Sequence, residues 1–452
     1  MEKSESREIQ QEQIDSTKFE NKNAEIEKER RTSSGDEKLL NEVRTMFQKL
    51  ESLSSTAECR IYRVPYNLRK VNEEAYTPQV ISIGPIHHND PRFQTMEKHK
   101  VRYLRSFIER KEIKTKLENL VGTIREMEDR IRHCYVATIL PESDDFVKMI
   151  MLDASFILEL FFKIAGGGLP RDDPLSVEAC LYCVVWQDLL LLENQLPFFV
   201  LEELYDLACP DYSKFVPLIY LTFSFFNSLN IHDVSSVNVK IQHFTDLLGT
   251  FQDRLGTFQL PYREPPVCKR RKKDGFLKYS ATQLHVAGVK FKKDSSKYLG
   301  DLNFKGGVLK IPVLEFDDNT EVLVRNIMAL EQRDDRRAAF ITDFYLIMDG
   351  LINTTKDVDL LIGKGIIVNF LGDNSAVKSL INNLNKEIFR IGVSNYTGLC
   401  DDLNDFYEEP WHRWKVILRD QYFSIPWRTA FTIAFIILLV LMLAQAVYFI
   451  IK

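Results

Sequence analysis

The 452-residue sequence lacks the short motifs by which most enzyme classes are recognised. It has no G-x-S-x-G nucleophile elbow, no G-x-x-x-x-G-K-[ST] phosphate loop, no H-E-x-x-H zinc motif, no EF-hand loop and no G-x-G-x-x-G fingerprint. Each of these patterns places a nucleophile, a metal ligand or a run of backbone amides where its chemistry needs them. We therefore predict a non-enzymatic protein with no catalytic residue and no cofactor.

Cysteine is scarce, and positive charge is not in excess. The seven cysteines are an odd number scattered along the chain, which is typical of reduced intracellular thiols and not of a disulfide framework. The net charge of −5 argues against general nucleic-acid binding. Cys180 and Cys183 form a C-x-x-C pattern, but no second pair follows at zinc spacing. We expect both thiols to pack in the core as parts of an apolar helix.

The amino terminus has no apolar run, and the long uncharged stretch lies at the opposite end, between Thr429 and Ile451. These 23 residues contain no charge, proline or glycine. At about 1.5 Å per residue they span roughly 34 Å, enough for the roughly 30 Å hydrocarbon core of a bilayer. We predict a single transmembrane helix in a tail-anchored protein without a secretory signal. More basic residues precede the span than follow it, which places the bulk of the chain in the cytosol, at the plasma membrane or an endomembrane.

The predicted fold is mainly α, an α+β protein with a small antiparallel sheet: one large soluble helical domain plus one carboxy-terminal transmembrane helix. Charge and apolar periodicity divide the chain into six regions. These are a disordered charged tail (1–36), an amphipathic lead-in helix (37–58), a helical first half (59–261), a basic proline-containing linker (262–280), a mixed second half (281–423) and the span (429–451).

Three apolar patterns predict particular helices. Between Leu117 and Cys134, apolar residues alternate at spacings of three and four, which indicates a helix with a seam of under three heptads. We expect this seam to pack within its own domain, and a coiled coil with a partner stays an alternative. A second helix is expected at 146–164, ended by three glycines. Pro197 should interrupt the apolar stretch 175–207, with Asn194 capping the second piece.

The second half contains the strand signals. Residues 289–291, 302–304 and 308–314 have strand-like composition, and Gly306-Gly307 predicts a hairpin turn between the last two. Pro312 lacks an amide donor, so we expect it to place its strand at an edge of the sheet.

Adjacent histidines follow a Gly-Pro turn. His87 and His88, with Asp90 nearby, are weak candidates for metal ligands. Successive side chains of an extended segment point in opposite directions, so we expect a structural or partner-contact role for both rings. The alternative is an enzyme of unknown reaction with a site around His87, His88, Asp90 and His99, which requires one pocket that joins them.

Five consecutive basic residues stand in the linker: Lys269, Arg270, Arg271, Lys272 and Lys273. Three interpretations are open. The run is a solvated surface loop, a nuclear import patch, or a lipid-facing patch that contacts anionic head groups, which a membrane anchor makes geometrically easy.

The sequence resembles the plant family called domain of unknown function 247. The stretches that carry the resemblance are YTPQVISIGP (76–85) with His87-His88, MEKHK (96–100), MLDASFILEL (151–160), DLLLLENQLPF (188–198), ATQL (281–284), LKIP (309–312), NIMALEQ (326–332), DGLIN (349–353), KGII (364–367) and WHRWK (411–415). The resemblance covers roughly residues 60–450. Ile86 and Gly350 depart from the family pattern, which usually has an aromatic residue and a serine there.

The resemblance implies a single-span plant membrane protein without assigned catalytic activity. Some grass members are linked to self-incompatibility, which is a recognition role. We therefore expect a membrane-anchored, non-enzymatic recognition or signalling protein. Its expected partners are the lipid bilayer and an unidentified protein, and a homo-oligomer stays open.

Overall fold

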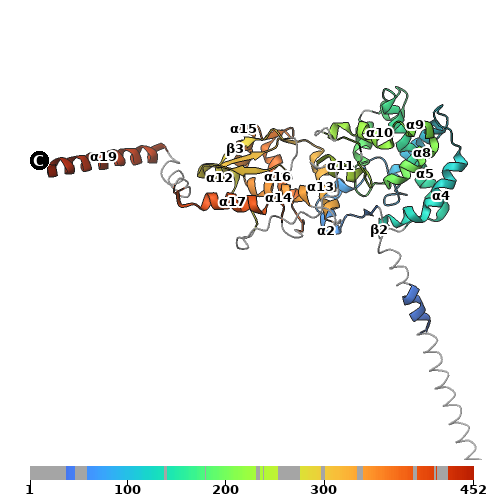
Figure 1. The fold of residues 1–452 in the computed structure, drawn as a ribbon, viewed down its shortest axis with the longest axis horizontal. Coiled ribbons are helices and arrows are strands. Elements are labelled where there is room, and N and C mark those ends of the chain that lie inside the picture. Colours follow the sequence, from blue (N-terminus) through green and yellow to red (C-terminus); the bar gives the residue numbers. More distant parts are fainter. Residues whose placement is uncertain are drawn as a thin grey trace, which may run out of the picture. The chain divides into compact units, whose positions relative to one another are not determined.

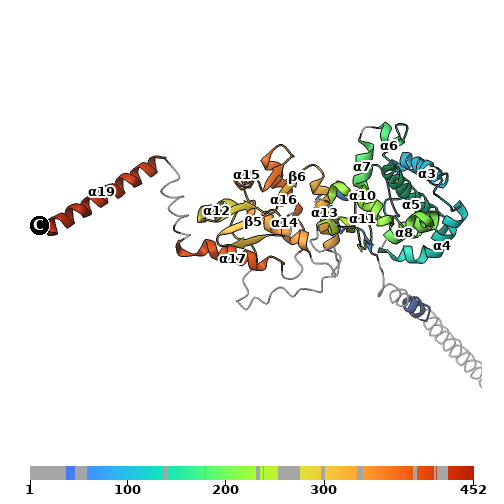
Figure 2. The same cartoon turned by 45° about the horizontal axis from the view of Figure 1, so that its top comes forward.

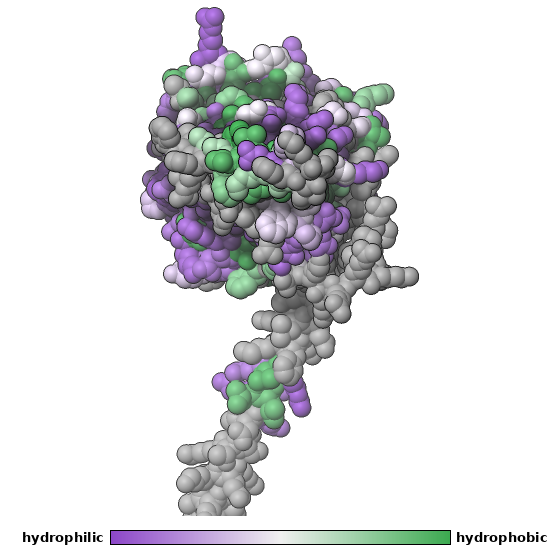
Figure 3. Space-filling view, turned by 90° about the vertical axis from the view of Figure 1, so that its left-hand side faces the viewer, coloured by the Kyte–Doolittle hydropathy of each residue, from purple (hydrophilic) through white to green (hydrophobic). Residues whose placement is uncertain are grey.

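The structure is a computed structural model. It describes residues 37–45, 59–136, 140–178, 180–230, 235–237, 239–252, 275–296, 301–332, 339–389, 394–411, 414 and 426–451. The chain divides into two compact units, Met1–Glu58 and Cys59–Lys452. In the first unit, residues 37–45 are helical, and Figure 3 shows their hydrophobic side chains gathered beside hydrophilic ones. The predicted tail 1–36 and the basic run Lys269 to Lys273 lie outside the described residues.

One apolar helix, α5 (Ser143–Ala165), lies at the centre of the amino-terminal half of the second unit (Figures 1 and 2). It packs against α3 (Gln94–Ile108), α4 (Leu117–His133), α8 (Phe198–Ala208) and α10 (Leu218–Phe225). Because α5 is apolar on nearly every side, it is stable only where neighbours cover it all round. The helix predicted over 146–164 is confirmed, and it ends at Gly166.

Smaller elements complete this half. They are β1 (Ile61–Tyr62), α2 (Tyr66–Arg69), η1 (Glu74–Tyr76), η2 (Pro91–Phe93), β2 (Tyr135–Val136), α6 (Pro174–Val177), α7 (Leu181–Asp188), α9 (Pro210–Ser213), η3 (Asn227–Leu229) and α11 (Phe244–Gln252). Strands β1 and β2 pair in parallel.

The heptad-like seam of α4 packs inside its own unit, as predicted. Leu120, Ile124 and Ile131 are at most 1% exposed, and α4 contacts α5 and α8. The seam therefore serves the core of this unit.

Pro197 interrupts the apolar stretch, as predicted, because α7 ends at Asp188 and α8 begins only after Pro197. The predicted cap is wrong. Asn194 instead accepts a hydrogen bond from the Ile83 amide and donates to the Ile81 carbonyl. Asn194 therefore binds the backbone of a segment more than 100 residues earlier in the chain. The local sequence pattern does not indicate such a contact.

The expected burial of the C-x-x-C pair is wrong, since Cys180 and Cys183 are both exposed. Helix α7 turns Leu181, Val185 and Asp188 inward. These positions, four and three residues apart, lie on one face of a helix, and Cys183 falls on the opposite face.

The carboxy-terminal half contains two small sheets. Strands β3 (Lys290–Lys293), β5 (Val308–Ile311) and β4 (Asn303–Lys305) form one sheet in the order β3-β5-β4. The hairpin around Gly306-Gly307 is confirmed, because β4 and β5 pair antiparallel and both glycines have positive φ. The prediction of a purely antiparallel sheet is wrong. The sheet is mixed, because β3 pairs in parallel with the other edge of β5.

Pro312 ends a strand instead of marking an edge. Strand β5 stops at Ile311 and is central in its sheet, so the edge prediction is wrong. After Pro312 the chain enters β6 (Leu314–Phe316), which pairs in parallel with β7 (Ile367–Asn369). A proline has no amide to donate, so the ladder breaks at this residue.

Seven helices of this half are described: α12 (Ala281–Ala287), α13 (Thr320–Glu331), α14 (Phe340–Leu351), α15 (Thr355–Gly363), α16 (Asn374–Leu384), α17 (Thr397–Glu408) and α19 (Pro426–Ile451). Helix α13 packs against η1 and α11 of the amino-terminal half. One cluster of buried apolar side chains runs from Cys59 to Leu403 through both halves. The fold is mainly helical with small sheets.

The stretch predicted to span a membrane is helical, as part of α19. Among the residues that the structure describes, no helix has both the length and the apolar character needed to cross a bilayer. The membrane crossing stays a prediction.

Candidate functional site

The segment 79–84 forms no helix or strand, yet buried side chains bind nearly all of its backbone amides. Asp188 is 1% exposed and accepts hydrogen bonds from the amides of Gln79, Val80 and Ile81 at 2.9, 2.8 and 3.0 Å. Burial raises the pKa of Asp188 to about 6, although these three amides favour the charged form. The carboxylate thus replaces a partner strand for this segment.

The same segment ends at Gly84, where the backbone needs glycine. Its φ is +72°, and a Cβ there would stand 2.6 Å from the Gln195 carbonyl oxygen. The Gly84 amide donates to Asp153 Oδ2 at 2.8 Å. Close approach of two backbones is therefore built into this turn.

Lys100 is fully buried behind the turn. Its ammonium donates to the Ser82 carbonyl at 2.5 Å, to Asp153 Oδ1 at 2.6 Å, and to Glu97. Burial alone would lower the pKa of Lys100, but Asp153 and Glu97 raise it above its ordinary value, so the amine stays charged. The Glu97 side chain is 33% exposed. It therefore connects this buried network to the surface.

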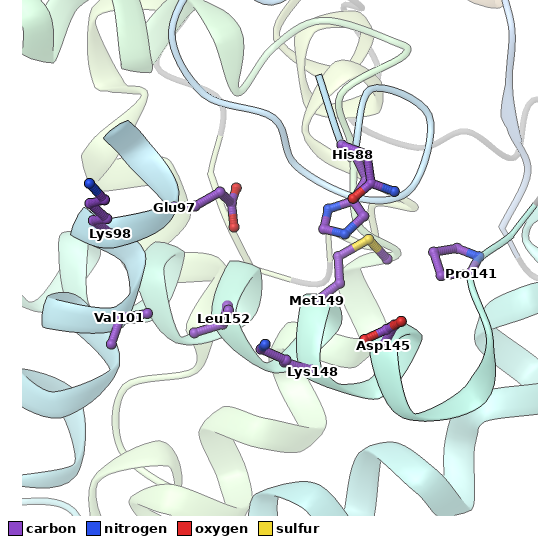
Figure 4. A pocket seen from close by; sticks show the side chains of 10 residues that line it. His88, Glu97, Lys98, Val101, Pro141, Asp145, Lys148, Met149 and Leu152 are labelled. Atoms are coloured by element: carbon purple, nitrogen blue, oxygen red, sulfur yellow. The ribbon is translucent and has the colours of Figure 1, made fainter. Parts of the chain in front are cut away.

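A pocket of about 410 Å³ opens beside Glu97, between α3 and α5 (Figure 4). Its lining residues come from α3, from α5 and from the connecting turns: Glu97, Lys98, Val101, Asp145, Lys148, Met149, Leu152, His88, Asn89 and Pro141. The α5 residues follow helical spacing and so share one face. In Figure 4 the His88 ring stands above Met149, and the Glu97 carboxylate is directed into the space between the helices.

The pocket combines an apolar floor with a charged rim. Met149 and Leu152 are buried, whereas Lys98, Asp145 and Lys148 are exposed. Within the described part of the chain, none of these three charged groups has a hydrogen-bond or ion-pair partner. Burial lowers the pKa of His88, so its imidazole is neutral at pH 7. The rim thus offers free charges of both signs around a neutral hydrogen-bonding ring.

The structure brings only one of the four predicted site residues into this pocket, His88. His87 turns away, with Nε2 3.1 Å from Glu193 Oε2. Asp90 caps η2 and pairs with Arg92, and His99 lies on the other side of α3 from Glu97. The two adjacent rings therefore diverge. Among the described residues, no group of three or more His, Cys, Asp or Glu side chains could hold a metal ion.

Glu193 anchors the turn from which His87 diverges. It accepts hydrogen bonds from the Val64 amide at 2.8 Å and from Arg69 at 2.7 Å. Burial alone would raise the pKa of Glu193, but the neighbouring His87 ring and the charge of Arg69 lower it. His87 thus lies beside a buried carboxylate that also bonds Val64 and Arg69. The structural or partner-contact role expected for His87 and His88 stays a prediction.

The buried network and the α5 wall were not predicted from the sequence. A signal for the network was present. Lys100 stands in the apolar stripe of α3, at helical spacing from Met96, Tyr103 and Phe107, all of which are buried. A lysine in such a stripe requires a buried anion, although the sequence does not say which carboxylate supplies it.

Known relatives agree with the resemblance carried by these segments. The family described as "plant protein of unknown function" matches residues 61–441. The chain is 30% identical over 409 residues to the Arabidopsis thaliana "UPF0481 protein At3g47200", covering 85% of each chain. It is 22% identical to the Arabidopsis thaliana "Putative UPF0481 protein At3g02645", covering 91% of this chain and 96% of the relative. No solved structure matches the chain. The protein belongs to the plant family of unknown function called domain of unknown function 247.

Proposed function

We propose that this protein is a membrane-anchored, non-enzymatic recognition protein that receives a side chain of a partner protein in the α3–α5 pocket. The observation that carries the proposal is the pocket's composition, a buried apolar floor under a rim with the exposed charges of Lys98, Asp145 and Lys148. Interface hot spots have this form, in which an apolar anchor enters a pocket and surrounding charges select the partner. The recognition role implied for some grass relatives is of the same kind.

The polar residues of the resemblance motifs support a scaffolding role for the rest of the fold. Lys100, Asp188 and Glu193 are all buried and bonded to other parts of the chain. They are therefore not available to a substrate. Of His87, His88, Asp90 and His99, only His88 lines the α3–α5 pocket, so we do not propose the alternative of an enzyme built on these four residues.

The anchor is supported by the chemistry of α19. The stretch 429–451 carries no charge, and its described apolar side chains are exposed, Phe435, Leu438 and Met442 by 59–66%. Exposed apolar side chains such as these are stabilised by a cover, and lipid supplies one. We place the folded unit on the cytosolic side of a single span.

The anchor is tested by fractionating plant cells that express the tagged full chain. We expect the wild type to stay in the membrane fraction after alkaline carbonate extraction. The double variant Leu438→Arg, Met442→Arg should become extractable, because each central arginine costs about 2.5–3.5 kcal/mol in a bilayer. The apolar control Leu438→Val, Met442→Leu should behave as wild type. A wild type released by carbonate contradicts the anchor.

The recognition site is tested by proximity labelling from the same full-length chain. Lys148→Glu reverses a charge on the pocket rim, and Lys356→Glu reverses an exposed lysine on α15 as the matched control. We expect Lys148→Glu to reduce labelling of the main wild-type partner about tenfold, which corresponds to about 1.4 kcal/mol, and Lys356→Glu to leave it unchanged. Equal labelling by both variants, or no enriched partner of the wild type, would refute the pocket as the recognition site.

A further inference from the structure

A pair of thiols lies outside the pocket, at the start of α7. Cys180 and Cys183 are exposed, whereas Cys59, Cys134, Cys209 and Cys400 are buried. Within the described chain, neither exposed thiol has a hydrogen-bond partner. The two groups are therefore open to reagents in solution, and no hydrogen bond from the described residues competes for them.

The helix places both thiols within one turn. Cys180 is the N-cap residue of α7, and its carbonyl accepts the first helical hydrogen bond, from the Val184 amide at 3.1 Å. Cys183 is the third residue of the helix. Cys180 has a left-handed backbone with φ 68° and ψ −3° directly before the first helical residue, and residues three apart along a helix have Cβ atoms about 5–6 Å from each other. A disulfide requires Cα atoms about 4.4–6.8 Å apart, so one helical turn can hold it after a small adjustment.

We propose that Cys180 and Cys183 are a reversible dithiol–disulfide site that is oxidised by small disulfides of the glutathione type. A thiolate of the pair attacks the small disulfide, forms a mixed disulfide and releases one small thiolate. The second thiolate then attacks the protein sulfur of that mixed disulfide, forms the Cys180–Cys183 bond and releases a second small thiolate. The two protons of the protein thiols end on the two small thiols, so the small disulfide is reduced as the protein pair is oxidised.

The location gives this step a structural consequence. Tyr182 and Trp186 of α7 pack on Phe225 and Phe226 at ring distances of 6.0 and 5.9 Å. A Cys180–Cys183 disulfide would constrain the helical turn that contains Tyr182, and with it the contact between Tyr182 and Phe225. An exposed disulfide within so short a loop is readily reduced again, which suits a regulatory pair and not a structural one.

The test treats the purified full-length protein with oxidised glutathione, blocks the remaining thiols and cleaves after glutamate. The fragment 179–193 carries both cysteines and no other. We expect this fragment to lose two hydrogen atoms in the wild type and to regain them with a reducing thiol. Cys183→Ser should instead carry one glutathione adduct on Cys180. The matched control Cys209→Ser, which replaces a buried cysteine, should form the bond as wild type does.

Two outcomes would overturn the proposal. One is a wild-type fragment that keeps two free thiols or carries two glutathione adducts. The other is a disulfide that joins either residue to one of the buried cysteines. A thermal melt of each variant, compared with the wild type, shows that the cysteines were probed in folded protein.

Discussion

Lys100 shows how single residues hold this fold together. A buried ammonium is unfavourable unless acceptors compensate for its lost hydration, and Lys100 has three: Ser82, Glu97 and Asp153. These acceptors belong to the irregular segment before α3, to α3 itself and to α5. One side chain therefore joins three parts of the chain, and one of its acceptors, Glu97, also lines the pocket.

We predict that Lys100→Met destabilises the protein by about 3–5 kcal/mol, because it leaves the Asp153 carboxylate buried without its cation. Denaturant unfolding of the purified full chain measures the effect. The control is Arg105→Ala on the same helix, whose ion pair with Glu109 is 79% and 61% exposed; it should cost less than about 1 kcal/mol. Similar losses for the two variants would show that the buried network contributes little.

At the scale of elements, a single carboxylate accepts hydrogen bonds at the amino-terminal ends of two helices. Asp357 is fully buried and accepts hydrogen bonds from the Thr282 amide in the first turn of α12 at 2.7 Å and from the Thr354 amide that caps α15 at 2.8 Å. It also accepts the Ser280 hydroxyl at 2.8 Å. Asp357 thus fixes the packing of α12 against α15, whose contact the structure shows.

We predict that Asp357→Ala destabilises the protein by about 3 kcal/mol, since two helix starts lose their acceptor. Hydrogen exchange should accelerate at the first turns of both α12 and α15. The control Asp373→Ala, which removes the surface cap of α16 alone, should cost about 1 kcal/mol. Acceleration confined to α15 would contradict the shared role.

The effect of Asp357→Ala on stability should depend on pH. Burial alone would raise the pKa of Asp357, but its hydrogen bonds lower it below the ordinary value of 3.8. The native state then binds fewer protons than the unfolded state, so this stabilisation is present above about pH 4 and is lost as the pH falls through the lowered pKa. The stability difference between wild type and Asp357→Ala should therefore shrink in acid.

At the scale of the whole folded unit, Asn326 joins the two halves. It is fully buried on α13 and accepts a hydrogen bond from the Leu192 amide at 2.8 Å while donating to the Ala75 carbonyl at 2.8 Å. Both partners belong to the amino-terminal half. The side chain also donates a hydrogen bond to the Val322 carbonyl within α13. Both the oxygen and the nitrogen of the side-chain amide are therefore hydrogen-bonded.

We predict that Asn326→Ala lowers the cooperativity of unfolding, seen as a smaller dependence of the unfolding free energy on denaturant. The control Asn385→Ala removes an amide that bonds Tyr345 and Ile381 within the carboxy-terminal half. It should lower stability and keep the wild-type denaturant dependence. If Asn326→Ala also keeps that dependence, the halves are joined mainly by their shared apolar core.

Local pattern was sufficient for several elements of this fold. Helices α4 and α5 follow from apolar spacing, the β4–β5 hairpin from Gly306-Gly307, and the break before α8 from Pro197. Each signal involves residues within a few positions of one another. Three other features depend on which elements pack beside them in the folded chain: the parallel pairing of β3 with β5, the place of Pro312 and the exposure of Cys183. The predictions made for them from the sequence were wrong or incomplete.

The sequence by itself determined the family, the mainly helical class, the uncharged stretch 429–451 and the grouping of His87 and His88 along the chain. Only the tertiary structure decided that these two rings diverge, that His88 joins Lys148 in one pocket, and that Lys100 pairs with Asp153, 53 residues away. The physical reason is the distance along the chain over which each kind of interaction acts. Periodicity and turn chemistry act between neighbours, whereas a pocket or a buried ion pair exists only where folding brings distant side chains together and removes water from between them.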